Sequence, residues 1–591
     1  MTNKWNYQPL TNQQKEQADA LHAHCGGNSA IAEVLLRRGV KSPAEADAFF
    51  TPAISDLHDP FLMPDMDKAV NRLNKAMGAK ERIMIYGDYD VDGTTAVALV
   101  YKYLQNYYSN IEYYIPTRYE EGYGISLKSI DYALENDVKL VIVLDCGIKA
   151  IDEIAYAKEH GIDFIICDHH VPDETLPPAV ANLHPKMPGS AYPCHHLSGC
   201  GVGFKFMQAF AQSNGLSNHN ELESLLDLVA VSIAADIVPI IDENRIMAYH
   251  GLKRLNSNPN LGLRSIIRLC KLTNKDITIS DVIFKIGPRI NASGRMQSGI
   301  EAVDLLVCRD LHDAYEKGKD IDQYNKDRKE LDKQITQEAN MLIEKNVAIV
   351  DGKRSIVVYN KDWHKGIIGI VASRLTELYY KPAVVLTFSN GLATGSRPPG
   401  AGVHLYPVQN RSVQGFDIYS AVNSTRDLLE NFGGHTYAVG LSLREENIPE
   451  FSRRFEEYVA SHIQPNQLSP QIDIDAVIEF ADITPELTGY LKKLNPYGPG
   501  NQKPVFCTRN VFDFGTSKLV GKNLEHIKLE LEDDSTSRVI NAIAFNMAPY
   551  FEHIHAHKPI DICYTIEQTK QGGHQESIQL MIRDIRLSEQ K

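Results

Sequence analysis

Three short clusters of acidic and imidazole side chains each follow an apolar run of the kind that forms a β-strand. The clusters are Tyr86-Gly-Asp88-Tyr-Asp90-Val-Asp92-Gly93, Asp145-Cys-Gly147 and Asp168-His169-His170. One such cluster alone fits a solvated turn equally well, but carboxylates that converge at one edge of a sheet repel one another and raise each other's pKa. Their joint presence therefore predicts a compensating cation. Oxygen ligands with one or two imidazoles favour Mg²⁺ or Mn²⁺, and the imidazoles favour Mn²⁺ of the two.

The apolar runs that precede these clusters alternate with helical patterns. Strands are predicted at residues 82–86, 140–144 and 164–167, and helices at residues 94–104 and 150–159. This alternation is typical of an α/β fold with a parallel, doubly wound sheet. Because the carboxyl ends of parallel strands share one edge of the sheet, ligands are expected at that edge.

The length of 591 residues is about four times a typical domain, so several packed units are expected. A charge-rich stretch without Gly or Pro predicts a linker helix. A second α/β unit follows it, with strands expected at residues 348–350 and 355–358, and short alternating runs then indicate a small all-β domain. The predicted segments are an N-terminal helical cover (1–75), the first α/β unit (76–319), the linker helix (320–346), the second α/β unit (347–462) and the all-β domain (463–591).

Composition and charge exclude several classes of protein. The chain has 43% apolar and 23% charged residues, which excludes collagen-like, mucin-like and wholly disordered chains. Its net charge of −14 means that any nucleic acid has to be held by local basic patches. No run approaches the ~20 apolar residues of a membrane span, and nine cysteines, an odd number, indicate reduced thiols. A cytoplasmic protein without membrane contact is expected.

Taken together, the motifs resemble the DHH phosphoesterase family and, within it, the bacterial RecJ-type exonucleases specific for single strands. The resemblance covers nearly the whole chain. It implies that residues 76–319 are a DHH catalytic domain, residues 347–462 a DHH-associated domain and residues 463–591 an OB-like domain that binds single strands. Besides the three clusters, the motifs are Ala235-Asp236-Ile237-Val238-Pro239, Pro288-Arg289-Ile290-Asn291-Ala292, Gly294-Arg295-Met296, Trp363-His364-Lys365-Gly366, Gly433-Gly434-His435 and Leu494-Asn-Pro-Tyr-Gly-Pro-Gly-Asn501.

The resemblance also implies ligands for Mn²⁺ or Mg²⁺. The second ion would use Asp90 and Asp145, with a third ligand at a position where many relatives carry His and this chain carries Tyr86. Because tyrosine is a poor ligand at neutral pH, this second site is expected to be weaker, to draw on Asp88, or to fill only with substrate. The first ion has a complete ligand set in this chain, with Asp145 bridging to the second: Asp92, Asp145, His169 and Asp236.

His170 is left to orient phosphate or to donate a proton, and the alternative is a ring that is only hydrogen-bonded beside the site. No covalent nucleophile is needed, because metal ions activate water and clamp the phosphoryl oxygens. The catalytic residues that the resemblance implies are Asp90, Asp92, Asp145, His169, His170 and Asp236.

Basic residues are expected to select the end of the strand. The resemblance places Arg118 and Arg289 in segments that line the channel and meet a terminal 5′-phosphate, and planar guanidinium groups suit such a phosphate. The alternative for Arg118 is a salt bridge with Glu120 or Glu121. In the second α/β unit the resemblance implies phosphate-cradling loops that carry Ser396, Arg397 and His435. Here Pro398-Pro399-Gly400 departs from the usual pattern, so His435 is the strongest of the three.

A zinc site is not expected, although Cys194, His195, His196 and Cys200 fall within seven residues. Their spacing fits no standard zinc pattern, and no second ligand pair accompanies them. The neighbouring segment 199–205 lacks the spacing of a P-loop and is interpreted as a turn into a helix.

The activity implied by the resemblance is a metal-dependent 5′ to 3′ exonuclease that hydrolyses single-stranded DNA to 5′-mononucleotides, in DNA recombination and repair. Alternatives are a DHH phosphodiesterase that acts on short oligoribonucleotides or cyclic dinucleotides, and a DHH protein that binds nucleic acid without cutting it. Expected partners are single-stranded DNA, a single-strand-binding protein and a helicase, and the chain is expected to be a monomer. Candidate strand-binding residues of the all-β domain are Phe512, Phe514, Lys518, Lys522 and Lys528.

Overall fold

The chain forms two compact units in its computed structural model. Unit 1 comprises residues 1–57, 239–249 and 471–591, and unit 2 comprises residues 58–238 and 250–470. Among the described residues, no helix is long and apolar enough to span a membrane. All nine cysteines are described, and none of them forms a disulfide bond. The structure describes residues 3–588 except for residues 119, 188, 217–218, 389–401, 405–412, 414, 436–437 and 572–574.

A five-stranded parallel sheet lies at one end of unit 2, with the strand order β3-β2-β4-β5-β6. β2 and β4 are neighbours although β3 lies between them in the chain, so the direction in which strands are added reverses there. In sheets of this kind, ligands bind at the carboxyl ends of the strands beside the reversal. The strands are β2 (Arg82–Gly87), β3 (Ile111–Tyr114), β4 (Val138–Leu144), β5 (Asp163–Cys167) and β6 (Ala181–Leu183).

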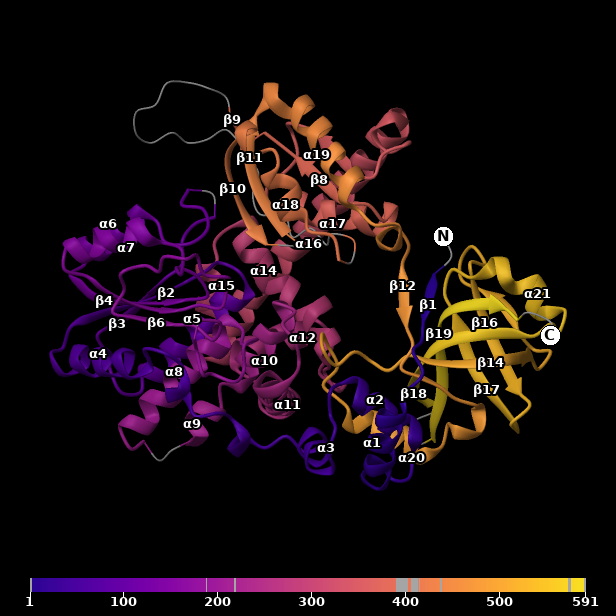
Figure 1. Cartoon of the computed structure of the whole chain (residues 1–591). Helices are drawn as coiled ribbons and strands as arrows, with labels where there is room; N and C mark the ends of the chain where they lie inside the picture. Colours follow the sequence, from indigo (N-terminus) through magenta and orange to yellow (C-terminus); the bar gives the residue numbers. More distant parts are fainter. Residues whose placement is uncertain are drawn as a thin grey trace. The chain divides into compact units, whose positions relative to one another are not determined.

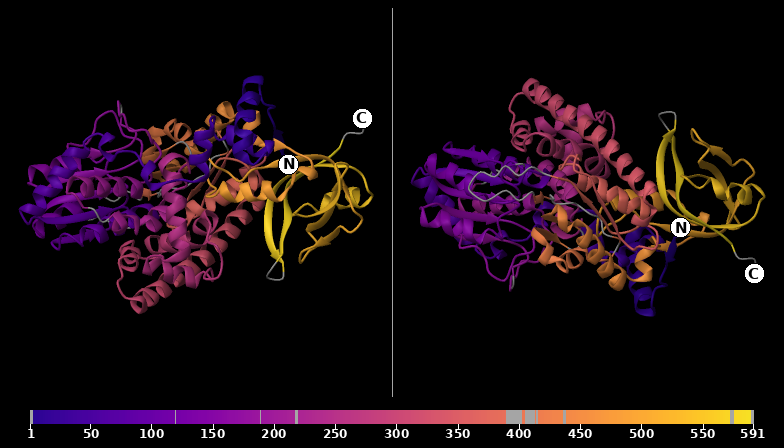
Figure 2. Two further views of the ribbon diagram at one scale, coloured as in Figure 1. Left: turned by 90° about the horizontal axis from the view of Figure 1, so that it is seen from below. Right: turned by 90° about the horizontal axis from the view of Figure 1, so that it is seen from above.

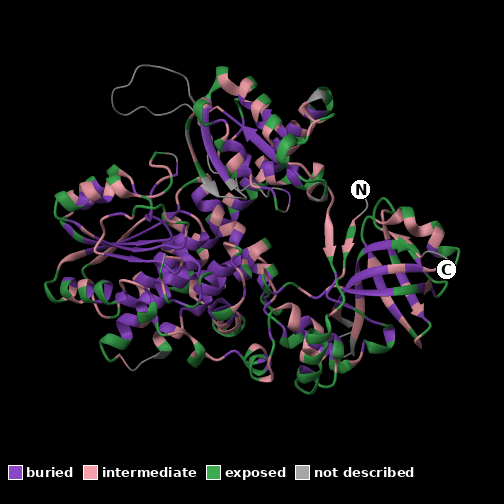
Figure 3. Cartoon of the chain, in the orientation of Figure 1, coloured by how far each residue is buried: buried purple, intermediate pink, exposed green. Residues whose placement is uncertain are grey.

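Helices cover both faces of this sheet, which confirms the predicted doubly wound α/β fold. Figure 1 shows α6 and α7 on one face and α4, α5 and α8 on the other. The central strands are buried (Figure 3), and burial on both faces explains why their apolar residues run on without alternation. The helices are α4 (Met66–Gly78), α5 (Val91–Leu104), α6 (Leu127–Glu135), α7 (Ile151–Glu159) and α8 (Gly199–Ser213).

A series of helices then leads to α16 (Leu311–Lys345), which contains most of the segment predicted as a linker helix. α16 begins where the Asp310 carboxylate accepts hydrogen bonds from the backbone N–H groups of His312 and Asp313, at 2.8 and 2.9 Å. The preceding helices are α9 (His219–Glu223), α10 (Leu226–Ala235), α11 (Asp242–Ser257), α12 (Leu261–Leu269), α13 (Ile279–Asp281), α14 (Gly287–Met296) and α15 (Ile300–Leu306), with a short π-helix (Val282–Ile286) before α14.

The second α/β region of unit 2 contains two small sheets around one apolar core. The strand predicted at residues 348–350 is wrong, because Val347–Ile349 forms a 3₁₀ turn. The Ile349 N–H donates to the Asn346 carbonyl at 2.9 Å, so these backbone groups close the end of α16 and are not available to a sheet. The elements are β7 (Ile356–Tyr359), α17 (Ile368–Tyr379), β8 (Ala383–Leu386), β9 (Gly402–His404), α18 (Ile418–Asn423), β10 (Leu429–His435), β11 (Ala438–Arg444) and α19 (Ile448–His462).

Five strands of unit 1 close into a barrel, seen from two further directions in Figure 2. Their order is β14-β18-β19-β17-β16, and a pairing of β16 with β14 closes the ring. This is the OB arrangement, with α21 (Phe551–His555) before the fourth strand, and it confirms the expected OB-like domain. β19 has no counterpart among the strand patterns identified in the sequence. The strands are β14 (Phe506–Asp513), β16 (His526–Asp533), β17 (Thr536–Ala544), β18 (Ile560–Gln571) and β19 (Gln575–Leu587).

The N-terminal helices belong to the same unit as the barrel and share its core. Leu21, Ile31 and Leu35 are buried in one cluster with Leu487 and Phe506. The structure thus divides the predicted 1–75 cover, because residues 1–57 lie in unit 1 and α4 lies in unit 2. The remaining elements of unit 1 are β1 (Lys4–Asn6), α1 (Asn12–His22), α2 (Ser29–Arg37), α3 (Pro43–Phe50), β12 (Gln471–Asp473), β13 (Ala476–Val477), α20 (Pro485–Lys493) and β15 (Lys518–Val520).

Candidate metal centre

The three sequence clusters meet at the carboxyl edge of the parallel sheet. Asp88 and Asp90 follow β2, Asp145 follows β4, and His169 follows β5. These strands are neighbours in the sheet, with the reversal of strand order between the first two. Asp236, directly after α10, joins them from the helical layer. The fold therefore assembles side chains that are up to about 150 residues apart in the sequence.

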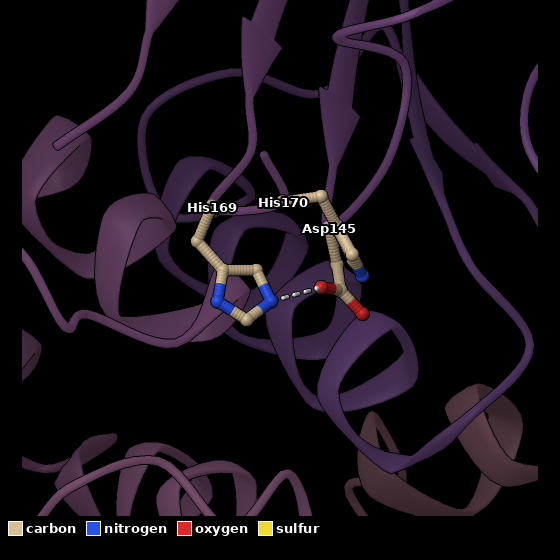
Figure 4. Close-up of side chains that lie close together, drawn as sticks. All are labelled: Asp145, His169 and His170. Carbon is tan, nitrogen blue, oxygen red and sulfur yellow. Dashed lines mark ion pairs between the residues drawn. The ribbon is translucent and has the colours of Figure 1, made fainter. Parts of the chain in front are cut away.

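Two groups of side chains share Asp145. In the first, His169 Nε2 lies 3.2 Å from Asp145 Oδ1, 3.6 Å from Asp236 Oδ2 and 3.8 Å from Asp92 Oδ2. Figure 4 shows the contact between His169 and Asp145, with His170 beside them. In the second group, one oxygen each of Asp88, Asp90 and Asp145 lie within 4.8 Å of one another.

The electrostatics of these groups suit a divalent cation. Burial, and after it the neighbouring carboxylates, raise the pKa of Asp88, Asp145 and Asp236 well above the ordinary value for aspartate. Burial and the nearby His170 lower the pKa of His169, so its imidazole is neutral and able to act as a ligand. Among the described residues, no hydrogen-bond partner is found for the buried atoms His169 Nε2 and Asp145 Oδ1. A cation between them would satisfy both atoms and offset the carboxylate repulsion.

The N-terminus of α8 holds Asp92. Asp92 Oδ2 accepts from the Gly199 N–H, and Oδ1 accepts from the Cys200 N–H and the Ser232 hydroxyl, each at 2.7 Å. Burial, and then the charge of Asp90, raise the pKa of Asp92 to about 6 despite these hydrogen bonds. Gly199 has no room for a side chain, since a Cβ there would lie 2.6 Å from Asp145 Cβ.

Asp168 orients the two histidines and does not face the cation position. Its Oδ1 accepts from the N–H groups of His169 and His170 and from His170 Nδ1 at 2.8 Å, and its Oδ2 accepts from the Ile148 N–H at 3.0 Å. Burial opposes charge on His170, but the ion pair with Asp168 raises the pKa of His170 to about 9. The same pair holds the pKa of Asp168 below its usual range against the effect of burial.

Tyr86 does not contribute to the second group. Its hydroxyl donates to the Gly124 carbonyl at 2.6 Å, and its ring stacks on Tyr114 with centroids 5.7 Å apart. Tyr86 therefore offers no ligand atom to this group, and the third oxygen that lies with those of Asp90 and Asp145 belongs to the buried Asp88, whose Oδ1 has no hydrogen-bond partner among the described residues.

Three family models match the chain: the DHH family N-terminal domain at residues 82–233, the DHHA1 domain at residues 352–461 and the RecJ OB domain at residues 474–584. The single-stranded-DNA-specific exonuclease RecJ of Bacillus subtilis is 34% identical over 590 residues, which cover 99% of this chain and 71% of that protein. RecJ of Haemophilus influenzae is 31% identical over 572 residues, covering 94% and 96%.

The chain belongs to the RecJ family of single-stranded-DNA-specific exonucleases. Solved structures agree with this fold. The structure of RecJ from Thermus thermophilus in complex with Mn²⁺ superposes with a TM-score of 0.81 at 24% identity, covering 99% of this chain and 80% of that one. A structure of exonuclease RecJ bound to manganese has a TM-score of 0.55 at 29% identity, covering 68% and 96%.

In this member of the RecJ family, Arg118 is buried close to the carboxylates. Its guanidinium carbon lies 5.1 Å from the centre of the Tyr89 ring, and its Nε has no hydrogen-bond partner in the part of the chain that the structure describes. Among the described residues no ion pair to Arg118 is found, because Glu120 pairs with Lys128 at 2.6 Å and Glu121 accepts hydrogen bonds from its own loop. The alternative interpretation of Arg118, a structural salt bridge with these two glutamates, is not present.

Arg289 has a different environment. Its Nε pairs with Asp322 of α16 at 2.8 Å, and a second guanidinium nitrogen donates to the Lys285 carbonyl at 2.7 Å. These contacts use two of the five guanidinium N–H donors, and the ion pair offsets the charge of Arg289. Arg289 is therefore held in place between helices in this conformation.

Sequence reasoning assigned no role to Arg295 and His364, which lie near Arg118. Burial, and then the charges of Arg118 and Arg328, lower the pKa of Arg295 to about 9, and Arg295 donates to the Gly366 carbonyl at 3.0 Å. Burial, Lys365 and Arg118 lower the pKa of His364. Both residues stand in motifs that carried the family resemblance, so the signal was present. The proximity of Arg295 to Arg118 depends on the position of α14, and that of His364 depends on the packing of the second α/β region.

Several other predicted residues lie partly or wholly outside the described structure. Ser396 and Arg397 fall in residues 389–401, which are not described. His435 ends β10, but its side chain is not described. Among the described residues, the groups that could hold a metal ion include no residue of the Cys194 to Cys200 segment.

The OB domain presents an aromatic residue that the sequence reasoning missed. Phe545 is 46% exposed and meets His526 edge to face, with centroids 4.9 Å apart. Of the predicted pair, Phe514 is 51% exposed, whereas Phe512 is partly buried on β14. Strand register places Lys518 beside Lys528 and Lys528 beside Ile543. Lys518, Lys522 and Lys528 are exposed.

Proposed function

We propose that this chain is a metal-dependent exonuclease that hydrolyses single-stranded DNA from the 5′ end to 5′-mononucleotides. The proposal depends on one observation in this chain of the RecJ family: two groups of acidic and histidine side chains share Asp145, and the buried side chains of Arg118 and Arg295 lie near them. Such a pair matches a two-ion site, and the cations match the terminal phosphate of a strand.

One divalent ion, Mn²⁺ or Mg²⁺, is assigned to Asp92, Asp145, His169 and Asp236, and a second, weaker one to Asp88, Asp90 and Asp145. When bound, these ions supply a hydroxide nucleophile at neutral pH and a clamp on the phosphoryl oxygens. The chain's own groups orient the reactants. Asp168 accepts a hydrogen bond from His170 Nδ1 at 2.8 Å and so fixes the orientation of the His170 ring beside the two groups. The α8 N-terminus fixes Asp92.

The polarity of digestion is assigned to Arg118 together with Arg295. Burial, and then the charge of Arg118, lower the pKa of Arg295 to about 9, so two positive charges lie close together in a buried setting, which is unfavourable unless an anion joins them. A terminal phosphate carries more charge than an internal phosphodiester and satisfies both groups. Arg289, which the sequence suggested for this role, is already paired with Asp322.

The OB domain is assigned to hold the strand on its way to the metal centre. The outer face of β16 and β17 carries His526, Lys528 and Ile543, with Phe545 at the end of β17. Exposed aromatic rings beside lysines suit stacked bases and phosphates. This platform differs from the one expected from the sequence, because Phe545 replaces Phe512.

Hydrolysis of short oligoribonucleotides or cyclic dinucleotides remains the alternative activity. A substrate of two or three nucleotides would not need the aromatic and lysine residues on the outer face of β16 and β17. The presence of this face therefore favours long strands as the substrate. The proposal also includes a monomeric state and a role in recombination and repair. Its expected protein partners are a single-strand-binding protein and a helicase.

The experiment is digestion of DNA labelled at either end, as single strand and as blunt duplex, beside a short RNA, with Mn²⁺ or Mg²⁺. We expect 5′-mononucleotides from the single strand only. Asp145→Asn should lower the rate at least about a hundredfold, since metal ions stabilise the transition state by several kcal/mol, and should retain binding of the strand. Release of label first from the 3′ end, or preference for the short RNA, would contradict the proposal.

A further inference from the structure

Tyr123 has an unusual orientation above the metal centre. It stands between Gly122 and Gly124, which both have φ of 86°, a conformation that favours glycine. The residue is 50% exposed, yet its hydroxyl points inward. Tyrosine at a surface normally buries its apolar ring and leaves the polar tip in water. The reversed arrangement requires a favourable contact of the hydroxyl inside.

That contact joins two groups of the site. The Tyr123 hydroxyl lies 3.3 Å from His170 Nε2 and 3.4 Å from His170 Nδ1, and it donates to the main-chain carbonyl of Asp145 at 3.4 Å. The Tyr123 and His170 rings meet edge to face, with centroids 5.9 Å apart. One hydroxyl thus contacts both the residue shared by the two carboxylate groups and the histidine that faces the phosphate position.

The loop around Tyr123 is fixed on both sides. The Tyr86 hydroxyl donates to the Gly124 carbonyl at 2.6 Å. On the other side, the Glu121 carboxylate accepts from the Thr117 N–H at 2.9 Å and from the Ser126 hydroxyl at 2.6 Å. These anchors hold the loop while the ring stays exposed. The Tyr86 hydroxyl therefore anchors the loop at the residue next to Tyr123.

Asp145 gains most from such a contact. Its φ of 62° is left-handed, which is unfavourable for a residue other than glycine and has to be held by its surroundings. The Asp145 N–H donates to the Cys167 carbonyl at 2.9 Å, and its carbonyl accepts from Tyr123. The main chain of the bridging carboxylate is therefore held from both sides.

We propose that Tyr123 is a positioning residue for hydrolysis. Its hydroxyl fixes the position of the His170 side chain relative to Asp145. The proposal rests on the proposed function. It predicts a chain of contacts from Asp168 through His170 and Tyr123 to Asp145, so that the ends of β5 and β4 act as one unit. The hydroxyl, and not the ring, is the part that matters.

The test is a double-mutant cycle with Tyr123→Phe and His170→Ala under saturating Mn²⁺. Tyr123→Phe should lower kcat by about tenfold or more, as expected when a group that orients a catalytic side chain is lost, and should change KM for a long single strand little. In the His170→Ala background the same change should have much less effect, because coupled residues are not additive. The ¹⁵N resonances of the His170 ring should shift in Tyr123→Phe.

The matched control is Tyr132→Phe, which removes a hydroxyl from α6 whose contact is with Glu112 at 3.4 Å. Its kcat should equal that of the wild type. Two outcomes would overturn the inference. The first is a wild-type kcat in Tyr123→Phe together with a lower kcat in Tyr123→Ala, which would show that the ring is responsible for the effect. The second is that the effects of Tyr123→Phe and His170→Ala on kcat are additive. An inactive wild type would instead reject the proposed exonuclease function, so the two failures are distinguishable.

Discussion

At the scale of single residues, Asp145 combines strained backbone, complete burial and two sets of like-charged neighbours. In the unfolded chain its carboxyl ionises near the ordinary value of 3.8, whereas in the folded chain burial and Asp92 raise its pKa well above that value. The carboxyl therefore lowers the stability of the metal-free protein increasingly as the pH rises above about 4. A neutral side chain at this position carries no such penalty.

We therefore expect Asp145→Asn to be more stable than the wild type at pH 7 in the presence of a chelator, by roughly 1 °C in Tm for each kcal/mol relieved in a unit of this size. The difference should shrink as the pH falls to 4. Adding Mn²⁺ should raise the Tm of the wild type and leave that of the variant nearly unchanged. Thermal unfolding followed by circular dichroism measures all three, and equal metal stabilisation of both proteins would argue against the assigned ligands.

Arg118 and Arg289 provide a matched pair, because the first has no ion pair among the described residues and the second is paired with Asp322. Charge-assisted contacts to a phosphate are worth about 1.5–3 kcal/mol, or roughly tenfold and more in affinity. Arg118→Ala should lose the preference for a 5′-phosphorylated over a 5′-hydroxyl strand. Arg289→Ala should keep that preference and lose some thermal stability. Competition binding of the 5′-phosphorylated and 5′-hydroxyl strands measures this preference in each variant. Loss of the preference in Arg289→Ala and not in Arg118→Ala would show that Arg289 has the role that the sequence suggested.

At the scale of elements, the N-terminus of α8 sets the position of two carboxylates at once. Its first two N–H groups bind Asp92, and Gly199 leaves room for Asp145, since an added Cβ would lie 2.6 Å from Asp145 Oδ1. Either the helix or Asp145 must shift if that space is filled. The element thus connects a helix terminus to the geometry of both metal groups.

Gly199→Ala should accordingly reduce exonuclease activity by at least about tenfold, because a displacement of this order is costly in a catalytic site. Gly203→Ala is the control on the same helix, since an added Cβ there meets only the ends of Leu144 and Val100 at 3.2 and 3.3 Å. Steady-state kinetics and Tm of both variants would be measured. Wild-type kcat in Gly199→Ala would show that Asp145 tolerates the shift.

The outer face of the barrel offers a second prediction at this scale. Phe545→Ala should weaken binding of a long single strand by about 1–3 kcal/mol, the range for one stacked base. Lys528→Ala should instead reduce the salt dependence of binding by about 0.7 in log–log slope. Neither change should alter turnover of a trinucleotide at saturation. Salt-titrated anisotropy is the measurement, with Leu524→Ala as an exposed apolar control on the loop before β16.

At the scale of the whole molecule, the C-terminal domain cannot be separated from the N-terminus by one cut. Residues 1–57 share their apolar core with the barrel, so a chain that ends at residue 470 would expose Leu21, Ile31 and Leu35. Each such side chain contributes roughly 1.5–3 kcal/mol when buried. The sum is comparable with the 5–15 kcal/mol that stabilises a typical domain.

We expect the chain of residues 1–470 to aggregate or to bind a hydrophobic dye. A chain of residues 58–470 should aggregate less and bind less dye. Arg245 in the segment 239–249 donates to the carbonyls of Phe49 and Leu494 within unit 1, so both truncated chains lose at least one of these partners. Size-exclusion chromatography and dye fluorescence compare the two chains. A monodisperse chain of residues 1–470 with a sharp unfolding transition would show that the N-terminal helices are stable without the barrel.

The amino-acid sequence by itself determined the doubly wound sheet, the carboxylate and histidine clusters at its strand ends and the presence of an all-β domain. These features follow from local order: strand and helix periods differ, and acidic residues directly after apolar runs have to lie at a strand end. The family resemblance added Asp236, which no local pattern connects to the other clusters.

Tertiary structure alone decided which of these groups meet and which cations are already paired. Arg118 and Arg289 look equivalent in the sequence, but only the packing of α14 on α16 gives Arg289 its carboxylate. Tyr123 turns its hydroxyl to His170 because distant strands and a pinned loop bring them together. The 1–57 segment packs on the barrel through apolar contacts, and the sequence does not indicate which domain these apolar residues pack against. Burial and long-range proximity set these outcomes, and neither is a property of a local run of residues.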